Sequence, residues 1–315
     1  MSSMRDFMRV GLIHFMAFPQ VGGGEGPILE TLRRIALDDY FDAVEITRIK
    51  DAGVRAQARD LLAGSHLTVA YGAHPIILGG KLNLNAVAED ERLNAVAIMK
   101  TAIDEAYEVG ASGFAFLSGR YEEASKETAL GQLVKSTVEL CQYAKARGNM
   151  PVVLEVFDYD IDKCSLIGPA PLAARYAREV RATCDNFGLL VDASHVPIIH
   201  ESFAEAVLPV KEYLVHAHLG NCVLDPAMPG YGDQHPRFGC PGGVNDVDEL
   251  CEFLRVLLEV GFLNPVTRPI VSFEVKPLAG EDPEVVIVNA KRTLNAAWAQ
   301  LENTLDMNKA KGLLA

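Results

Sequence analysis

Short apolar runs alternate along the chain with longer segments whose apolar residues recur at helical spacing. Eight of the runs are rich in β-branched and aromatic residues, which favours strands. Between them, apolar residues lie three and four positions apart, as at Leu250, Phe253 and Leu257, which predicts amphipathic helices. The predicted strands span residues 10–18, 43–49, 66–73, 113–119, 151–157, 187–195, 213–220 and 270–277.

Several predicted strands are apolar throughout, such as Val152-Val153-Leu154. Such strands need cover on both faces, as parallel strands in α/β proteins have. Eight strand–helix units therefore predict a (β/α)8 TIM barrel. An open doubly wound sheet is the alternative, but the glycine-rich segment 22–26 after the first strand lacks the spacings of a phosphate-binding loop. We expect one barrel domain over residues 1–315, with an extended loop at 222–243 and a C-terminal helix at 283–307.

Composition narrows the choice of partners. The 315 residues carry a net charge of −13, which disfavours binding to nucleic acid or to an anionic membrane surface. The six cysteines show no CxxC pairing, as expected of reduced thiols in a cytosolic protein. No signal peptide or membrane-spanning segment is evident. We therefore expect a cytoplasmic protein that acts on a small molecule.

Four of the later predicted strands end in a residue that can bind a metal ion. Glu155, Asp192 and Glu274 each follow an apolar run, and His218 lies near the end of the seventh strand. Functional side chains of a TIM barrel project from these C-terminal strand ends. Three carboxylates converging there would repel one another unless one kept its proton or a cation bound between them. The sequence therefore predicts a divalent cation bound by these four residues.

Three carboxylates and one imidazole favour a hard or borderline ion. We expect Mn²⁺, with Mg²⁺, Co²⁺, Fe²⁺ and Zn²⁺ as alternatives. Any one of the acidic residues could instead cap a helix or form a salt bridge, but four strands with such ends favour a metal site. We expect only one of His216 and His218 to face the barrel interior, and we assign a structural role to His216.

The series Glu155, Asp192-Ala-Ser-His195, His216-Ala-His218 and Phe273-Glu274-Val275 resembles the xylose isomerase-like TIM-barrel superfamily, especially its sugar isomerases and ketose 3-epimerases. The resemblance implies the metal ligands predicted above. It also implies that Glu155 and Glu274 abstract and return the proton beside a substrate carbonyl, and that His195 contacts a substrate hydroxyl. A carboxylate beside a metal-polarised carbonyl is chemically suited to this step. The expected catalytic residues are Glu155, Glu274 and His195.

A narrower resemblance rests on segments 11–19, 38–47, 68–75 and 232–239. These segments are similar to the α subunits of bacterial C-glycoside deglycosidases, which belong to the same superfamily. The resemblance implies cleavage of the sugar–aglycone C–C bond of 3-oxo-C-glycosides, with a small β subunit as partner. Without that partner we expect a homo-oligomer. The alternative reaction is ketose 3-epimerisation or isomerisation of a sugar or sugar phosphate.

The predicted loop after the seventh strand contains Asp233-Gln-His235 and Arg237 between glycine- and proline-rich segments. It fits a solvated turn, or a loop that reaches over the substrate. His14 and His74 belong to the deglycosidase-like segments, although His14 equally fits a buried core histidine. The expected substrate contacts are His195, His235, Arg237, His14 and His74.

Two other functions stay open. The pairs Asp192/His195 and Asp233/His235 also resemble endonuclease IV-like nucleases, which hold three zinc ions, and His74 could supply an early histidine ligand. However, the fourth predicted strand ends without a histidine, and the net charge poorly suits DNA binding. A non-catalytic barrel that keeps its metal for stability is the other alternative, because structural metal sites are commonly closed by four protein ligands.

Overall fold

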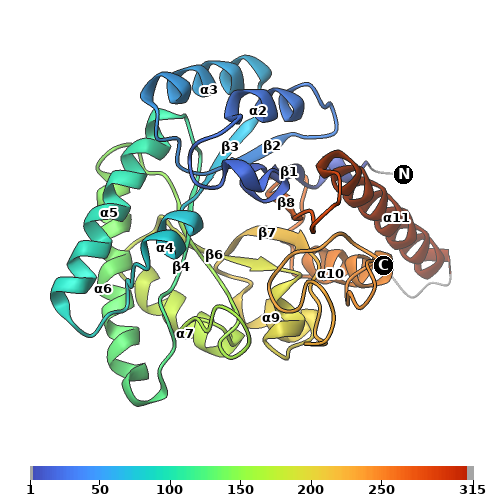
Figure 1. The fold of residues 1–315 in the computed structure, drawn as a ribbon. Coiled ribbons are helices and arrows are strands. Elements are labelled where there is room, and N and C mark those ends of the chain that lie inside the picture. The colour runs from blue at the N-terminus through green and yellow to red at the C-terminus, as the bar shows by residue number, and fades with distance from the viewer. Residues whose placement is uncertain (1–2, 311–315) are drawn as a thin grey trace.

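The computed structural model describes residues 3–310. Eight parallel strands form one closed barrel in chain order, and β1 pairs with β8 to complete it (Figure 1). This is the predicted (β/α)8 architecture. The strands are β1 (Arg9–Ile13), β2 (Ala43–Ile46), β3 (Thr68–Gly72), β4 (Phe114–Leu117), β5 (Val152–Glu155), β6 (Phe187–Asp192), β7 (Leu214–Gly220) and β8 (Ile270–Glu274).

Helices surround the barrel (Figure 1). None of those within residues 3–310 is both long and apolar enough to cross a lipid bilayer. The α-helices are α1 (His14–Ala17), α2 (Ile28–Ala36), α3 (Ala52–Ser65), α4 (His74–Gly80), α5 (Glu89–Glu108), α6 (Lys126–Lys145), α7 (Ala170–Arg181), α8 (His195–Ile198), α9 (Phe203–Val207), α10 (Val247–Glu259) and α11 (Pro283–Ala310).

Several strands end earlier than the sequence predicts. The predicted strand 10–18 ends at Ile13, because α1 begins at the next residue. The predicted strand 187–195 ends at Asp192, and α8 begins at His195. The short helices that follow are buried and as apolar as the strands, so hydrophobic periodicity does not separate them over four residues.

The main hydrophobic core lies on the outer faces of the strands, against the helices, and includes Leu154, Leu189 and Phe273. Because side chains alternate along a strand, the residues next to these face the barrel interior. The neighbours of Leu154 and Phe273 toward the C-terminal strand ends are Glu155 and Glu274. The outer faces therefore stabilise the barrel while the same strands turn charged groups inward.

A second, small apolar cluster joins Ala115, Val153 and Leu190. Val153 lies two residues before Glu155, and Leu190 lies two residues before Asp192, so each pair shares one strand face. The cluster therefore forms an apolar layer directly below two of the predicted metal ligands. It closes the barrel interior beneath the site.

Candidate metal centre and active site

The four predicted ligands come together at the C-terminal end of the barrel. One donor atom from each of Glu155, Asp192, His218 and Glu274 lies within 4.8 Å of the other three. Strand register explains the convergence, because His218 pairs with Asp192 across β6 and β7, and Gly220 pairs with Glu274 across β7 and β8. The side chains of all four residues are buried.

Each of these residues has one buried polar atom whose contacts lack the geometry of a hydrogen bond. His218 Nδ1 lies 2.8 Å from Glu274 Oε2, 3.4 Å from Glu155 Oε1 and 3.9 Å from Asp192 Oδ2. An unsatisfied buried polar group costs about 1–3 kcal/mol of folding free energy. A divalent cation among the four would satisfy all of them, so the residues fit a metal site. The unpartnered atoms are Glu155 Oε1, Asp192 Oδ2, His218 Nδ1 and Glu274 Oε2.

The three carboxyl groups differ in their pKa. Burial raises the pKa of Asp192 to about 7, and the charge of Glu274 adds to the effect. Burial acts in the same direction on Glu155, but the nearby His218 and His74 outweigh it and lower the pKa of Glu155. At Glu274, burial also acts to raise the pKa, but nearby histidines, chiefly His235, outweigh it, so the pKa of Glu274 is lowered. Without a cation, Asp192 is the carboxyl group that holds a proton near neutral pH.

Both His216 and His218 face the barrel interior. Nε2 of His216 lies 2.8 Å, and Nε2 of His218 3.1 Å, from the same Oε1 of Glu45 on β2. The expectation that only one of the two histidines points inward was wrong, because residues two apart on a strand share a face.

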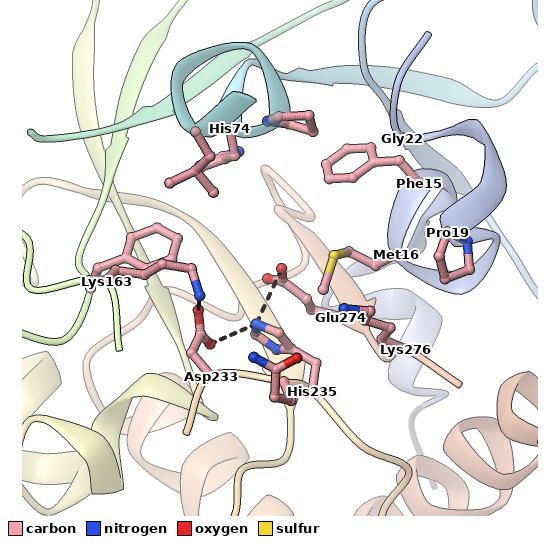
Figure 2. Close-up of a pocket in the computed structure, with 14 residues that line it drawn as sticks. Phe15, Met16, Pro19, Gly22, His74, Lys163, Asp233, His235, Glu274 and Lys276 are labelled. Atoms are coloured by element: carbon pink, nitrogen blue, oxygen red, sulfur yellow. Dashed lines mark ion pairs between the residues drawn. The ribbon is translucent and has the colours of Figure 1, made fainter. Parts of the chain in front are cut away.

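A second polar cluster is centred on Asp233. Its Oδ1 lies 3.0 Å from Nε2 of His195 and 2.7 Å from Nε2 of His235. Its Oδ2 lies 2.8 Å from Lys163 Nζ. His235 Nε2 is 3.5 Å from Glu274 Oε1, so a chain of ion pairs runs from Lys163 to the predicted ligand Glu274 (Figure 2).

The loop after β5 places Lys163. The buried carboxylate of Asp158 accepts hydrogen bonds from four backbone N–H groups of this loop, those of Ile161, Asp162, Lys163 and Cys164, at 2.7–3.2 Å. The side chain of Asp162 in turn accepts a bond from the Asp233 backbone N–H at 3.1 Å. The loops after β5 and β7 are therefore held together beside the site.

A cavity of about 310 Å³ opens beside the candidate metal site (Figure 2). One part of its wall is polar and contains Glu274, His235, Asp233 and two lysines. The rest of its wall is mostly apolar. The apolar lining residues are Phe15, Met16, Pro19, Pro75, Leu78 and Phe157, and the lysines are Lys163 and Lys276.

Of the five expected substrate contacts, only His74 and His235 line this cavity. The Nδ1 of His195 lies 2.8 Å from the backbone oxygen of Val156, and its Nε2 lies 3.0 Å from Asp233 Oδ1. Both ring nitrogens of His195 therefore already have partners. Arg237 pairs with Glu281 at 3.0 Å, outside the cavity lining. His14 is buried against Thr31 Oγ1 at 2.7 Å, and burial lowers its pKa to about 3. The structure therefore does not bring His14, His195 or Arg237 to the cavity wall.

A family model described as xylose isomerase-like TIM barrel matches residues 34–280. The chain belongs to this family. Solved structures with the same fold include L-ribulose 3-epimerase, at 15% identity and TM-score 0.72, covering 95% of this chain and 97% of that one. The IolI protein with a bound zinc atom shares 15% identity at TM-score 0.71, with coverage of 93% and 99%. The 3-keto-D-glucoside 4-epimerase from E. coli shares 18% identity at TM-score 0.61, with coverage of 94% and 99%. Comparison with curated proteins finds no match.

Sequence reasoning missed four polar residues of this xylose isomerase-like barrel. Glu45 carries the same signal as the predicted ligands, a carboxylate within the apolar run Ala43-Val44-Glu45-Ile46, and could have been found by it. Lys276 lies two residues after Glu274, so alternation along an extended chain could have placed it toward the cavity. Asp158 and Lys163 lie in a loop without periodicity, and only the folded loop reveals their roles.

Proposed function

We propose that the chain is a divalent-metal-dependent enzyme that moves the proton on the carbon beside the carbonyl of a keto sugar. The observation that carries this proposal is the convergence of four buried donor atoms, one of which belongs to Glu274, a residue that lines a cavity large enough for a small ligand. When bound, a divalent cation would polarise the carbonyl and acidify the neighbouring C–H bond. Mn²⁺ stays our first choice of ion.

Two carboxylates approach the site from different strands. Glu274 lines the cavity directly, so it is placed to take the proton from the substrate carbon. Glu155 is not part of the cavity lining. However, its Oε2 lies 2.9 Å from Nε2 of His74, and His74 does line the cavity. We assign the return of a proton on the other face to the His74–Glu155 pair. Asp233 and His235 orient substrate hydroxyl groups at the polar wall.

Ketose epimerisation is the reaction that the comparisons favour. Structures of L-ribulose 3-epimerase and D-tagatose 3-epimerase-like protein share the fold over about the full chain. Removal of a proton from one face of a carbon and return to the other inverts that carbon, and two bases on different strands suit this step. Isomerisation between aldose and ketose would use the same first step.

Cleavage of a 3-oxo-C-glycoside is the second candidate, favoured by the apolar wall of Phe15, Met16 and Phe157 beside the metal site. An aromatic aglycone would pack there. In this reaction Glu274 removes the proton from the carbon beside the carbonyl, and the electron pair of the broken C–H bond forms a C=C bond. The C–C bond to the aglycone breaks, and its electron pair goes to the aglycone carbon, which takes up a proton. A small β subunit is the expected partner.

The decisive experiment incubates the purified Mn²⁺-loaded chain with a panel of ketohexoses in D₂O and follows the products by NMR. Deuterium incorporation together with formation of an epimer is the expected result. Turnover only of a 3-oxo-C-glycoside, with a co-expressed small β subunit, would replace epimerisation by the second candidate. Absence of both reactions would overturn the proposed function.

A further inference from the structure

Glu45 is a buried carboxylate on β2, a strand that pairs with neither β6 nor β8. Its Oε1 lies 3.1 Å from Nε2 of the proposed ligand His218 and 2.8 Å from Nε2 of His216. Glu45 therefore reaches across the interior to β7 and contacts the histidine that faces the candidate metal site. None of the proposed catalytic steps uses it.

The two ring nitrogens of His218 face different groups. Nε2 faces Glu45, whereas Nδ1 faces Glu155, Asp192 and Glu274 at 2.8–3.9 Å. A carboxylate can only accept a hydrogen bond, so a bond to Glu45 places the His218 proton on Nε2. A neutral imidazole then has its lone pair on Nδ1, the atom directed at the site.

We propose that Glu45 is a positioning residue for the metal centre: it fixes the tautomer and ring orientation of His218 so that Nδ1 is available to a divalent cation. The inference rests on the metal site of the proposed function. Carboxylates that hold a metal-binding histidine in this way commonly contribute 10–100-fold to metal affinity. Glu45 supplies this contribution from the opposite side of the barrel.

His216 secures Glu45. The rings of His216 and His218 meet edge to face, with centroids 5.1 Å apart and an interplanar angle of 86°. Both donate to the same oxygen of Glu45, which limits rotation of its carboxylate. We expect His216 to act only through Glu45, and loss of His216 to matter less than loss of Glu45.

Glu45, His216 and His218 lie close enough to be considered as a second cation site. That arrangement would require a lone pair on Nε2 of His218 as well as on Nδ1. A neutral imidazole has only one such lone pair, so His218 cannot serve both ions without losing its last ring proton. The geometry therefore favours a hydrogen bond at Glu45 over a second ion.

The test compares Mn²⁺ dissociation constants of the full chain, measured by calorimetry, for the wild type, Glu45→Gln, His216→Gln and Glu274→Gln. Glu45→Gln keeps the size of the side chain but removes its charge, and it is expected to weaken Mn²⁺ binding about 10–100-fold. His216→Gln is expected to weaken it less. Glu105→Gln is the matched control, because Glu105 also accepts hydrogen bonds from Ile49 and Tyr71 but lies on α5, and no change is expected.

The melting temperature of each metal-free variant separates positioning from loss of folding. The proposal requires Glu45→Gln to weaken Mn²⁺ binding while the metal-free melting temperature stays within a few degrees of the wild type. An unchanged Mn²⁺ affinity in Glu45→Gln, with binding lost in Glu274→Gln, would overturn the positioning role alone. Unchanged binding in Glu274→Gln would instead overturn the metal site itself. Two bound ions in the wild type, with one lost in His216→Gln, would replace the hydrogen bond by a second cation.

Discussion

Lys163 Nζ lies 2.8 Å from Asp233 Oδ2, the carboxylate oxygen that His195 and His235 leave free. The ammonium group thus occupies the place next to Asp233 where a further cation would bind. Like charges repel strongly in a buried site. We therefore expect this ion pair to favour one bound metal ion over the three zinc ions of the nuclease interpretation.

We expect one divalent ion per chain after dialysis against Mn²⁺, measured by elemental analysis. In Lys163→Met the repelling charge is absent, so a second and weaker ion is expected beside Asp233 Oδ2. Two or three tightly bound ions in the wild type would contradict this prediction and support a nuclease-like centre.

The two glutamates are expected to fail in different ways. At saturating Mn²⁺, Glu274→Gln should abolish both product formation and exchange of the substrate proton with D₂O, because it removes the proposed metal-site carboxylate that lines the cavity and takes the proton. Glu155→Gln should abolish product formation but leave exchange, since Glu274 still removes the proton. Each loss is expected to be about 10²–10⁴-fold in rate. Full activity in both variants would refute the mechanism, and Glu105→Gln serves as the control.

Metal affinity should depend on pH through Asp192. Its pKa of about 7 arises mainly from burial, and a cation requires the ionised carboxylate. Below about pH 7, protons compete with the cation for this residue. Each further drop of one pH unit should then lower the Mn²⁺ affinity by an additional factor of about ten, compared with the same drop above pH 7. Calorimetric titrations across this range measure the pH at which the slope of the Mn²⁺ affinity changes. The same change of slope in Asp192→Asn would show that another group causes it.

Gly220 has a packing role that a single methyl group would disturb. A Cβ atom there would lie 3.0 Å from the Glu274 backbone oxygen and 3.1 Å from Asp192 Oδ1. Gly220→Ala is therefore expected to destabilise the fold by about 1–3 kcal/mol and to weaken Mn²⁺ binding. Gly131→Ala is the matched control, since a Cβ at this position in α6 meets no atom within 4 Å, and alanine should stabilise the helix by about 0.5–1 kcal/mol. Denaturant unfolding compares the two.

The loop after β5 depends on Asp158. Asp158→Ala removes the acceptor of four backbone hydrogen bonds and should lower the unfolding free energy by about 1–3 kcal/mol. It should also raise KM, because Lys163 and the cavity wall lose their support. Asp160→Ala in the same loop, which removes only an exposed pair with His200, is expected to change neither quantity. Equal melting temperatures for the two variants would contradict this role.

The barrel was predictable because most of its strands bury both faces and therefore appear as nearly continuous apolar runs. Strand ends were harder to predict, as at Ile13, where the buried helix α1 continues the same apolar pattern. The convergence of Glu155, Asp192, His218 and Glu274 followed from one rule, that parallel strands of a barrel bring their C-terminal ends together. Their distances confirm that convergence, whereas metal binding itself stays a prediction.

The surroundings of the site were less predictable because they depend on loops. His195 is three residues from Asp192, yet its ring is held by Val156 and Asp233 from other segments. The role of Lys163 depends on four hydrogen bonds to Asp158 that no periodicity signals. Glu45 was in contrast predictable, because it is a carboxylate within an apolar strand, which is the pattern that identified the proposed metal ligands.

The candidate metal centre and its positioning residue draw on strands far apart in the chain, because Glu45 lies on β2, 171 positions before His216, and Glu274 lies on the last strand. Pairing of β7 with β8 brings Glu274 to the other proposed ligands, and pairing of β1 with β8 closes the ring that places Glu45 beside His218. A nascent chain that has not yet formed β8 lacks one ligand and leaves the ring open. Ion loading should therefore follow completion of the barrel, so the cation would be a late addition to a finished scaffold instead of a nucleus around which it folds.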